Sequence, residues 1–146
     1  MRANAQFVTP LLGIAGLVPF VLPALLVVSG SALAAASTQI AAAYALAIIC
    51  FLCGSWWGMA QASGIRATLL LSNVYLLLAL GLYLSVIEWW PLAAMLLLLG
   101  AWTCEHSRHL FPALPPSYRQ LRTLLTLVAA SSMGVIQFST QTSVIR

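Results

Sequence analysis

Apolar residues run along this chain in long, nearly continuous stretches that short polar segments interrupt. Each stretch is about as long as a helix that crosses a hydrocarbon core, which takes about 20 residues. The stretches are too continuous for the alternating pattern of a barrel, so the pattern favours membrane-spanning helices. The predicted spans are residues 7–29, 40–59, 67–87, 90–109 and 121–138.

The composition favours the same fold class. Of the 146 residues, 62% are hydrophobic and 5% are charged, whereas about 25% are charged in a soluble domain. The net charge is +4, but the arginines are scattered, which excludes a nucleic-acid footprint. We therefore expect an all-α, polytopic membrane protein. Its single domain, residues 1–146, would be a bundle of five transmembrane helices.

The arginines predict the orientation of this bundle. One side of the membrane would carry five of them: Arg2, Arg66, Arg108, Arg119 and Arg122. The other side would carry only Arg146. Basic residues collect on the inner side of such proteins, so we expect the N-terminus inside and the C-terminus outside. Ala32-Leu33-Ala34 after the first span imitates a signal-peptide cleavage site, but the apolar run of about 20 residues exceeds a signal core of 7–15 residues.

Two pairs of tryptophans are predicted to mark the two water interfaces. Trp56 and Trp57 would lie at one interface, and Trp89 and Trp90 at the other, beside Glu88. Such aromatic belts are typical of membrane proteins. No charged residue falls well inside a span, which argues against an ion path or a proton relay.

Small residues repeat along one face of two spans. Because lipid supplies no hydrophobic drive between helices, close contact through small residues must hold a bundle together. We interpret these stripes as helix contacts, within the chain or against a partner. The stripe residues are Ala43, Ala47, Gly54 and Gly58 in the second span, and Thr126, Ala130 and Gly134 in the fifth.

The polar segment after the fourth span is the one candidate metal site. His106 and His109 are one helical turn apart, with Cys104 close by, and these residue types can ligate zinc, copper or haem. The stronger interpretation is that they are interfacial anchors where a helix leaves the membrane. Cys50 and Cys53 have the spacing of a redox motif, but no base or cation lies beside them in the sequence. We expect no cofactor and no metal.

A basic corner is predicted where the last helix begins. Arg119 and Arg122 are one turn apart and follow Tyr118, so they could clasp lipid phosphates or a partner's acidic loop. Positive-inside anchoring is the plain explanation.

Catalysis is the least favoured class of function. The chain lacks a nucleotide-binding loop, a metalloprotease motif and a convergent Ser/His/Asp set. Its two carboxylates, Glu88 and Glu105, are predicted on opposite membrane faces, where they could not cooperate as general acid and base.

Three segments resemble motifs of one family. Leu12–Phe20 is similar to its opening helix, Tyr44–Gly58 to its Tyr…Phe-x-x-Gly-x-x-Trp-Gly segment, and Pro116–Thr126 to its Pro-x-Tyr-x-x-Leu-Arg…Leu-Thr signature. The chain thus resembles the transmembrane protein 69-like family, a domain of unknown function. The family pattern commonly has a His where this chain has Trp56. The resemblance implies five helices in a bacterial inner membrane, or in the mitochondrial inner membrane of a eukaryote.

Three functions compete on these grounds. The first is a non-catalytic accessory or assembly subunit of a larger, plausibly respiratory, membrane complex, with membrane lipids and other integral subunits as partners. The second is a binder or carrier of a lipophilic molecule such as a lipid or quinone, using the kinked first span and the basic corner. The third is a small channel or uniporter, which would need a polar lumen or an oligomer.

Overall fold

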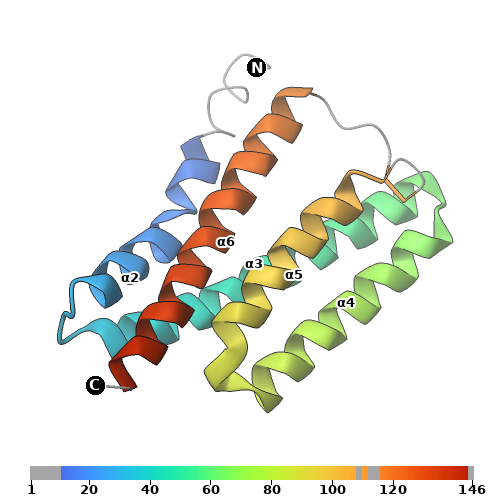
Figure 1. The fold of residues 1–146 in the computed structure, drawn as a ribbon. Helices are drawn as coiled ribbons and strands as arrows, with labels where there is room; N and C mark the ends of the chain where they lie inside the picture. The colour runs from blue at the N-terminus through green and yellow to red at the C-terminus, as the bar shows by residue number, and fades with distance from the viewer. Residues whose placement is uncertain (1–10, 108–109, 112–115, 145–146) are drawn as a thin grey trace.

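The chain is folded into helices joined by short turns (Figure 1). The computed structural model describes residues 11–107, 110–111 and 116–144. Residues 11–15 are helical and lead into the first labelled helix. The labelled elements are α2 (Val18–Val28), α3 (Ala34–Ser63), α4 (Arg66–Ser85), the short 3-10 helix η1 (Ile87–Trp89), α5 (Trp90–Glu105) and α6 (Pro116–Val144).

The prediction of an all-α fold is confirmed in the described part of the chain, and its helices suit a multi-pass membrane protein. Five helical stretches there are long and apolar enough to cross a membrane. Two helices begin earlier than the hydrophobic pattern predicts. α3 begins at Ala34, because the alanines that precede the apolar run favour helix. α6 begins at Pro116, since proline fits the first turn of a helix.

The first span is broken near its start. The helical turn over residues 11–15 gives way to a turn at Gly16 and Leu17, and α2 then begins at Val18. Pro19 explains the break, because proline lacks an N–H and its ring clashes with the carbonyl four residues earlier. The interpretation of this span as kinked is therefore confirmed.

A glycine in the left-handed conformation ends α3. Gly64 has φ 73°, and its N–H donates to the carbonyl of Ala60 at 2.8 Å. Only glycine adopts this conformation without a steric penalty. The chain then reverses into α4 at Arg66, which sets α4 beside α3 (Figure 1).

The helices are arranged around α3. α6 lies between α2 and α5, and α4 lies on the far side of α5 (Figure 1). α3 passes behind this row and packs against α2, α4 and α5. The core therefore lies between α3 and the row of helices in front of it.

The small-residue stripe of α3 faces away from this core. Its four residues, Ala43, Ala47, Gly54 and Gly58, are all exposed. Among the described residues, no heavy atom lies within 4 Å of where a Cβ would stand at either glycine. The opposite face packs instead, through Ala41, Ala45, Ile49, Leu52, Cys53, Trp56 and Ala60. This corrects the expectation that the stripe joins helices of this chain, and leaves contact with a partner as its open alternative.

The small-residue stripe of α6, in contrast, faces the core. Thr126, Ala130 and Gly134 are buried. A Cβ at Gly134 would lie 3.0 Å from the sulfur of Met95 in α5, so this glycine permits α5 and α6 to approach closely. The two stripes look alike in sequence, but they face in different directions.

The two tryptophan pairs are each divided between core and surface. Trp57 and Trp89 are exposed, whereas Trp56 and Trp90 have no exposed surface. The indole N–H of Trp90 donates to the carbonyl of Ala42 at 2.9 Å. The expectation that all four tryptophans form aromatic belts is therefore wrong for Trp56 and Trp90, because a buried backbone or side-chain acceptor satisfies each indole.

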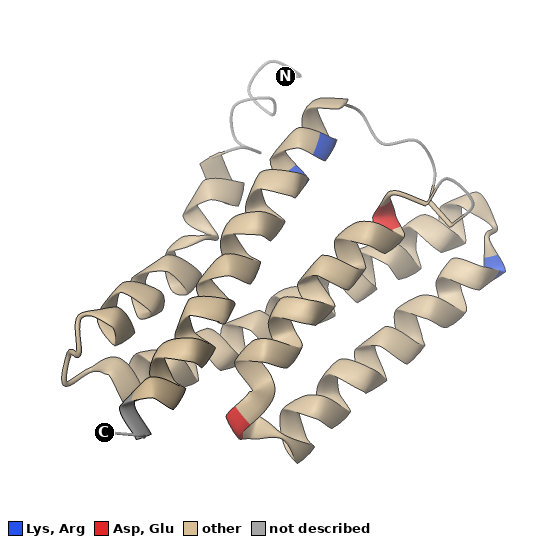
Figure 2. Cartoon of the chain, viewed as in Figure 1, with Lys and Arg blue, Asp and Glu red and all other residues tan. Residues whose placement is uncertain are grey.

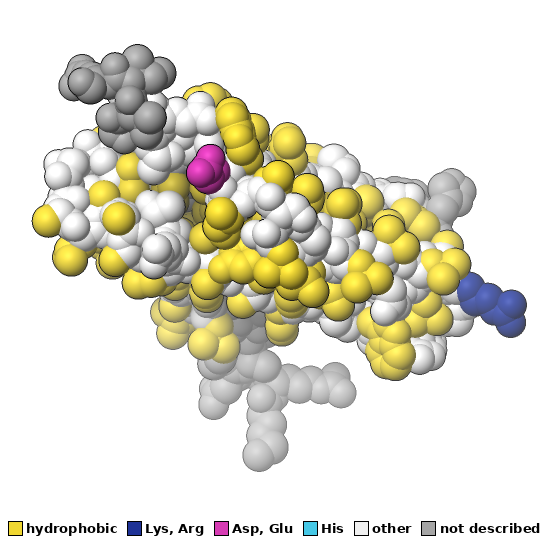
Figure 3. All heavy atoms as spheres, turned by 90° about the horizontal axis from the view of Figure 1, so that it is seen from below, with side chains coloured by type: hydrophobic (Ala, Val, Ile, Leu, Met, Phe, Trp, Pro, Cys, Tyr) yellow, Lys and Arg dark blue, Asp and Glu magenta, His cyan; other side chains and the backbone are white. Residues whose placement is uncertain are grey.

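The described charged residues lie at the ends of the helices (Figure 2). Arg66, Arg119 and Arg122 share one end with Glu105, whereas Glu88 lies at the opposite end of α5. Seen from below, the molecule presents an acidic side chain amid hydrophobic ones, and a basic side chain projects at its edge (Figure 3). The two carboxylates are therefore about 25 Å apart along the direction of α5, while their placement on opposite membrane faces stays a prediction.

Candidate functional site

A largely buried ion pair joins α5 to α6 at the arginine-rich end. Arg122 donates from Nε to Oε2 of Glu105 at 2.8 Å and from Nη2 to Oε1 at 3.2 Å. The side chains are only 11% and 7% exposed. Glu105 is the last residue of α5, and Arg122 lies in the second turn of α6. Two parallel hydrogen bonds make this the strongest geometry for such a pair.

Trp56 brings α3 to the same carboxylate. Its indole N–H donates to Oε1 of Glu105 at 2.9 Å. The indole ring packs between Tyr75 and Phe111, with ring centroids 5.3 and 5.2 Å away. The carboxylate thus ties α3, α5 and α6 together, and the indole gives it a third hydrogen bond away from water.

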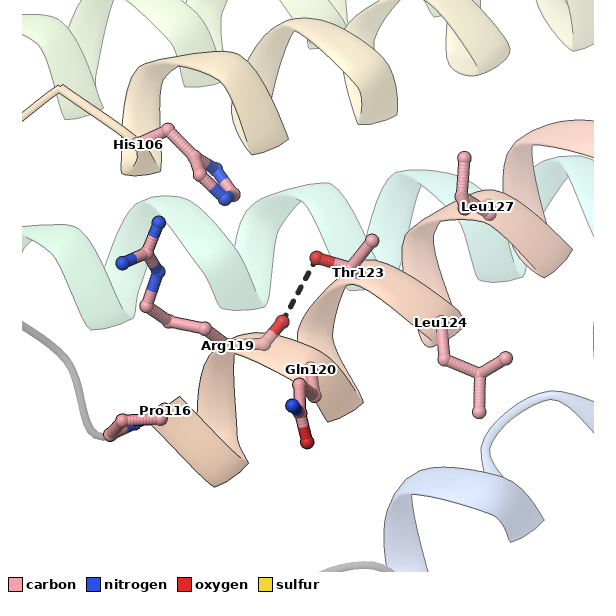
Figure 4. A pocket seen from close by; sticks show the side chains of 7 residues that line it. All are labelled: His106, Pro116, Arg119, Gln120, Thr123, Leu124 and Leu127. Carbon is pink, nitrogen blue, oxygen red and sulfur yellow. Dashed lines mark hydrogen bonds between the residues drawn. The ribbon is translucent and has the colours of Figure 1, made fainter.

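The two arginines of the predicted basic corner therefore separate. Arg122 is turned inward onto Glu105, so its charge is compensated inside the protein. Arg119 is exposed and points toward His106 across a surface hollow of about 550 Å³ (Figure 4). Of the predicted pair, only Arg119 is free to reach a lipid phosphate or a partner's acidic loop.

This hollow has a polar end and an apolar end. His106, Arg119, Gln120 and Thr123 line one part, and Leu124 and Leu127 continue along α6 toward the apolar span (Figure 4). Thr123 is already satisfied, since it donates to the carbonyl of Arg119 at 2.9 Å and accepts from the indole of Trp102. The arrangement suits an amphipathic molecule at the membrane surface.

The metal candidates are not gathered into a site in the described residues. His106 Nδ1 lies 2.8 Å from the carbonyl of Trp102, and its ring packs on that indole at 4.4 Å. Cys104 is half-buried and free, and His109 lies outside the described residues. Within the described ranges, no three His, Cys, Asp or Glu side chains are close enough to hold an ion.

A partly open cavity of about 410 Å³ lies between the first span, α3 and α6. We refer to it as the slot. Its walls are mostly apolar, with contributions from Leu17, Phe20, Ile48 and Leu125, and it is bounded by Tyr118 toward the arginine-rich end. Thr126 also lines it. This hydroxyl is buried without a hydrogen-bond partner among the described residues.

Sequence reasoning missed both the Trp56–Glu105 bond and the slot. The residues involved lie far apart in the chain and come together only through helix packing. The one signal in the sequence was Trp56 itself, a tryptophan about one turn before residue 59, where the second span is predicted to end. Two tyrosines also join separate helical segments, since Tyr44 donates to the carbonyl of Gly16 at 3.1 Å and Tyr75 to that of Leu97.

One comparison with known sequences is informative. The profile of a family described as "Protein of unknown function (DUF3429)" matches residues 6–138. No curated protein and no solved structure matches the chain. The family description names no activity, and it does not mention the transmembrane protein 69-like family, so that resemblance stays a prediction.

Proposed function

We propose, from the premise that this chain belongs to the DUF3429 family, that it is a non-catalytic subunit that docks to other integral membrane proteins through α3. The observation that carries the proposal is the outward direction of the stripe formed by Ala43, Ala47, Gly54 and Gly58. Membrane helices associate closely where small residues let backbones approach. On α3 these small residues face away from the other helices of the chain, so a helix of another protein could approach the backbone of α3 there.

The length of α3 adds to this argument. It has 30 residues, about 45 Å of helix, and the stripe extends over its middle and its end. Both glycines have open space around them among the described residues. A partner helix could therefore approach the backbone of α3 closely at these two glycines, beside the exposed ring of Phe51.

The distribution of polar chemistry supports a non-catalytic role. Glu88 and Glu105 lie at opposite ends of the bundle. Glu105 is already engaged by Arg122 and Trp56. Neither carboxylate is thus placed to exchange protons with the other, and a subunit that organises or stabilises a complex needs no such pair.

The proposal also covers location and orientation. Arg66, Arg119 and Arg122 gather at one end of the bundle (Figure 2). By the positive-inside rule, that end would face the cytoplasm or matrix. The family resemblance favours a bacterial inner membrane, or the mitochondrial inner membrane in a eukaryote, with lipids and integral subunits as partners.

The test compares native assemblies of three forms of the tagged protein. These are the wild type, the double variant Gly54→Leu/Gly58→Leu and the control Gly81→Leu. Gly81 is likewise exposed on a helix, with no heavy atom of the described residues within 4 Å. Leucine favours helix over glycine, so neither change should unfold the span. The assemblies are extracted in mild detergent, separated on native gels and identified by mass spectrometry.

We expect the wild type and Gly81→Leu to migrate with integral membrane partners, and the double variant to migrate alone. Crosslinked masses in multiples of 15.6 kDa would instead identify a second copy of this chain as the occupant. A wild-type protein that migrates as a monomer, or a double variant that keeps its partners, would refute the docking role.

The slot favours a second candidate function, the binding or carriage of a lipophilic molecule. Its apolar walls and its volume of about 410 Å³ could accommodate a hydrocarbon chain. Mass spectrometry of organic extracts from the purified protein tests this role, since a stoichiometric lipid or quinone would support it. Extracts that hold only the bulk lipid composition would argue against it.

A further inference from the structure

Thr126 carries an unpaired hydroxyl and lines the slot. Elsewhere on α6, Thr123, Ser132 and Thr142 donate to the carbonyl one turn earlier, at 2.6 to 2.9 Å. Thr126 is 2% exposed and has no such bond among the described residues. A buried hydroxyl without a partner is costly where no water can replace that partner. A ligand that offers an acceptor to this hydroxyl would remove the cost.

The charges near the slot indicate what kind of molecule fits. Arg122 also lines the slot, one helical turn or about 6 Å along α6 from Thr126. Its guanidinium is compensated by both oxygens of Glu105. An ionised head group would find no uncompensated positive charge on this wall. Tyr44 is also engaged, since its hydroxyl donates to the carbonyl of Gly16.

The shape of the slot indicates an extended molecule. Its α6 wall runs from Tyr118 to Ala129, about 16 Å at 1.5 Å per residue. Leu12 and Tyr118 are exposed, so the slot reaches the surface at the arginine-rich end. The deeper walls, Leu17, Phe20 and Ile48, are apolar. α2 and α6, which form its two sides, lie next to each other (Figure 1).

We propose that the slot binds an uncharged, carbonyl-bearing lipid whose carbonyl oxygen accepts a hydrogen bond from Thr126 and whose hydrocarbon chain fills the apolar walls. This inference rests on the second candidate function and names its site and ligand chemistry. A quinone with a hydrocarbon tail and a neutral glyceride share this chemistry. The test therefore includes one probe of each kind.

The experiment measures uptake of three probes by the delipidated full-length protein in detergent. The probes are a decyl-substituted benzoquinone, dioleoylglycerol and hexadecane, which lacks a carbonyl. Thr126→Val removes the hydroxyl and nearly keeps the shape. Ser132→Ala removes a buried hydroxyl that is already satisfied by Val128 and lies outside the slot lining. Ala129→Leu fills the slot from its α6 wall.

Thr126→Val should bind one carbonyl probe roughly three- to tenfold more weakly than the wild type, the worth of one hydrogen bond. Its affinity for hexadecane should not change. The carbonyl probe whose affinity falls shows whether the natural ligand is of the quinone kind or the glyceride kind. Ser132→Ala should match the wild type with all three probes, and Ala129→Leu should lose them all. The thermal midpoint of delipidated Thr126→Val should equal or exceed that of the wild type, because an unsatisfied hydroxyl is removed.

Two results would overturn the inference in distinguishable ways. If the wild type takes up the carbonyl probes and Thr126→Val binds them equally well, the assignment of the carbonyl to Thr126 fails and the lipophilic-binding role stands. If the wild type takes up no probe, both fail. The docking role of α3 is independent of either result, since its stripe lies on the face of α3 opposite the core.

Discussion

Trp56, Glu105 and Arg122 show how a membrane bundle accommodates an ionised pair. Each member satisfies another, with N···O distances of 2.8 to 3.2 Å. A buried charge without its partner is costly, whereas a complete hydrogen-bonded set is tolerated. This set closes the arginine-rich end of the bundle by joining three helices.

We predict that Arg122→Met strongly destabilises the protein, by about 3–5 kcal/mol, because Glu105 would be left buried without its partner. The double variant Arg122→Met/Glu105→Met should recover most of this loss. Thermal unfolding can be followed with a thiol-reactive dye, because Cys53 is free and buried. A double variant no more stable than Arg122→Met would contradict the account of the pair.

Trp56→Phe should lower stability by about 1.5–3 kcal/mol, the worth of a hydrogen bond to a charged group. The matched control is Trp57→Phe, because Trp57 is the next residue and is 48% exposed. The same dye assay measures both variants. Equal thermal midpoints for Trp56→Phe and Trp57→Phe would show that the indole bond to Glu105 does not stabilise the fold.

At the scale of the helices, alanine substitutions at two glycines should change stability in opposite directions. Gly64 lies just before α4, and Gly81 lies inside it. Gly64→Ala should cost about 1–2 kcal/mol, because φ 73° forces the new Cβ into a strained conformation. Gly81→Ala should stabilise by about 0.5–1 kcal/mol, because it lies in a helix interior with open space among the described residues.

These two variants can be compared in one series of thermal midpoints in detergent. A drop at Gly64 together with a rise at Gly81 is the expected result. A rise at both positions would mean that the turn after α3 is not held in the left-handed conformation.

The hydrophobic pattern was sufficient to predict which segments are helices, because lipid demands helices of a fixed length. It was not sufficient to predict which way each helix faces. Ala43, Ala47, Gly54 and Gly58 have the same spacing as a contact face, and only the packing of Trp56 and Ile49 on the opposite side turns them outward. In a span that is apolar all round, the periodicity that reveals direction in soluble helices is weak.

The candidate site was predictable only in part for the same reason. The predicted basic corner is divided, since Arg119 is exposed whereas Arg122 faces inward because Glu105, 17 residues earlier, ends α5 beside it. Thr126 was predicted as a packing residue, and it is buried. That its hydroxyl lacks a partner follows from the orientation of one side chain, which no spacing rule reveals.

On the scale of the whole molecule, the structure describes a bundle with chemically different ends. Among the described residues, one end carries Arg66, Arg119, Arg122 and Glu105, and the other carries Glu88 (Figure 2). In the described part of the chain, no charged residue lies in the apolar middle of the bundle between these two ends. If all five apolar helices cross the membrane, as we propose, the two termini lie on opposite sides of it.

The most direct test of this account is a topology measurement with reporter fusions in a bacterial inner membrane. Alkaline phosphatase, active only outside, and green fluorescent protein, fluorescent only inside, are fused after Gly30, Gly64, Val86, Ser107 and Arg146. We predict fluorescence at Gly64 and Ser107, and phosphatase activity at Gly30, Val86 and Arg146. Phosphatase activity at Gly64 or Ser107, or fluorescence at Arg146, would contradict five crossings with the arginine-rich end inside.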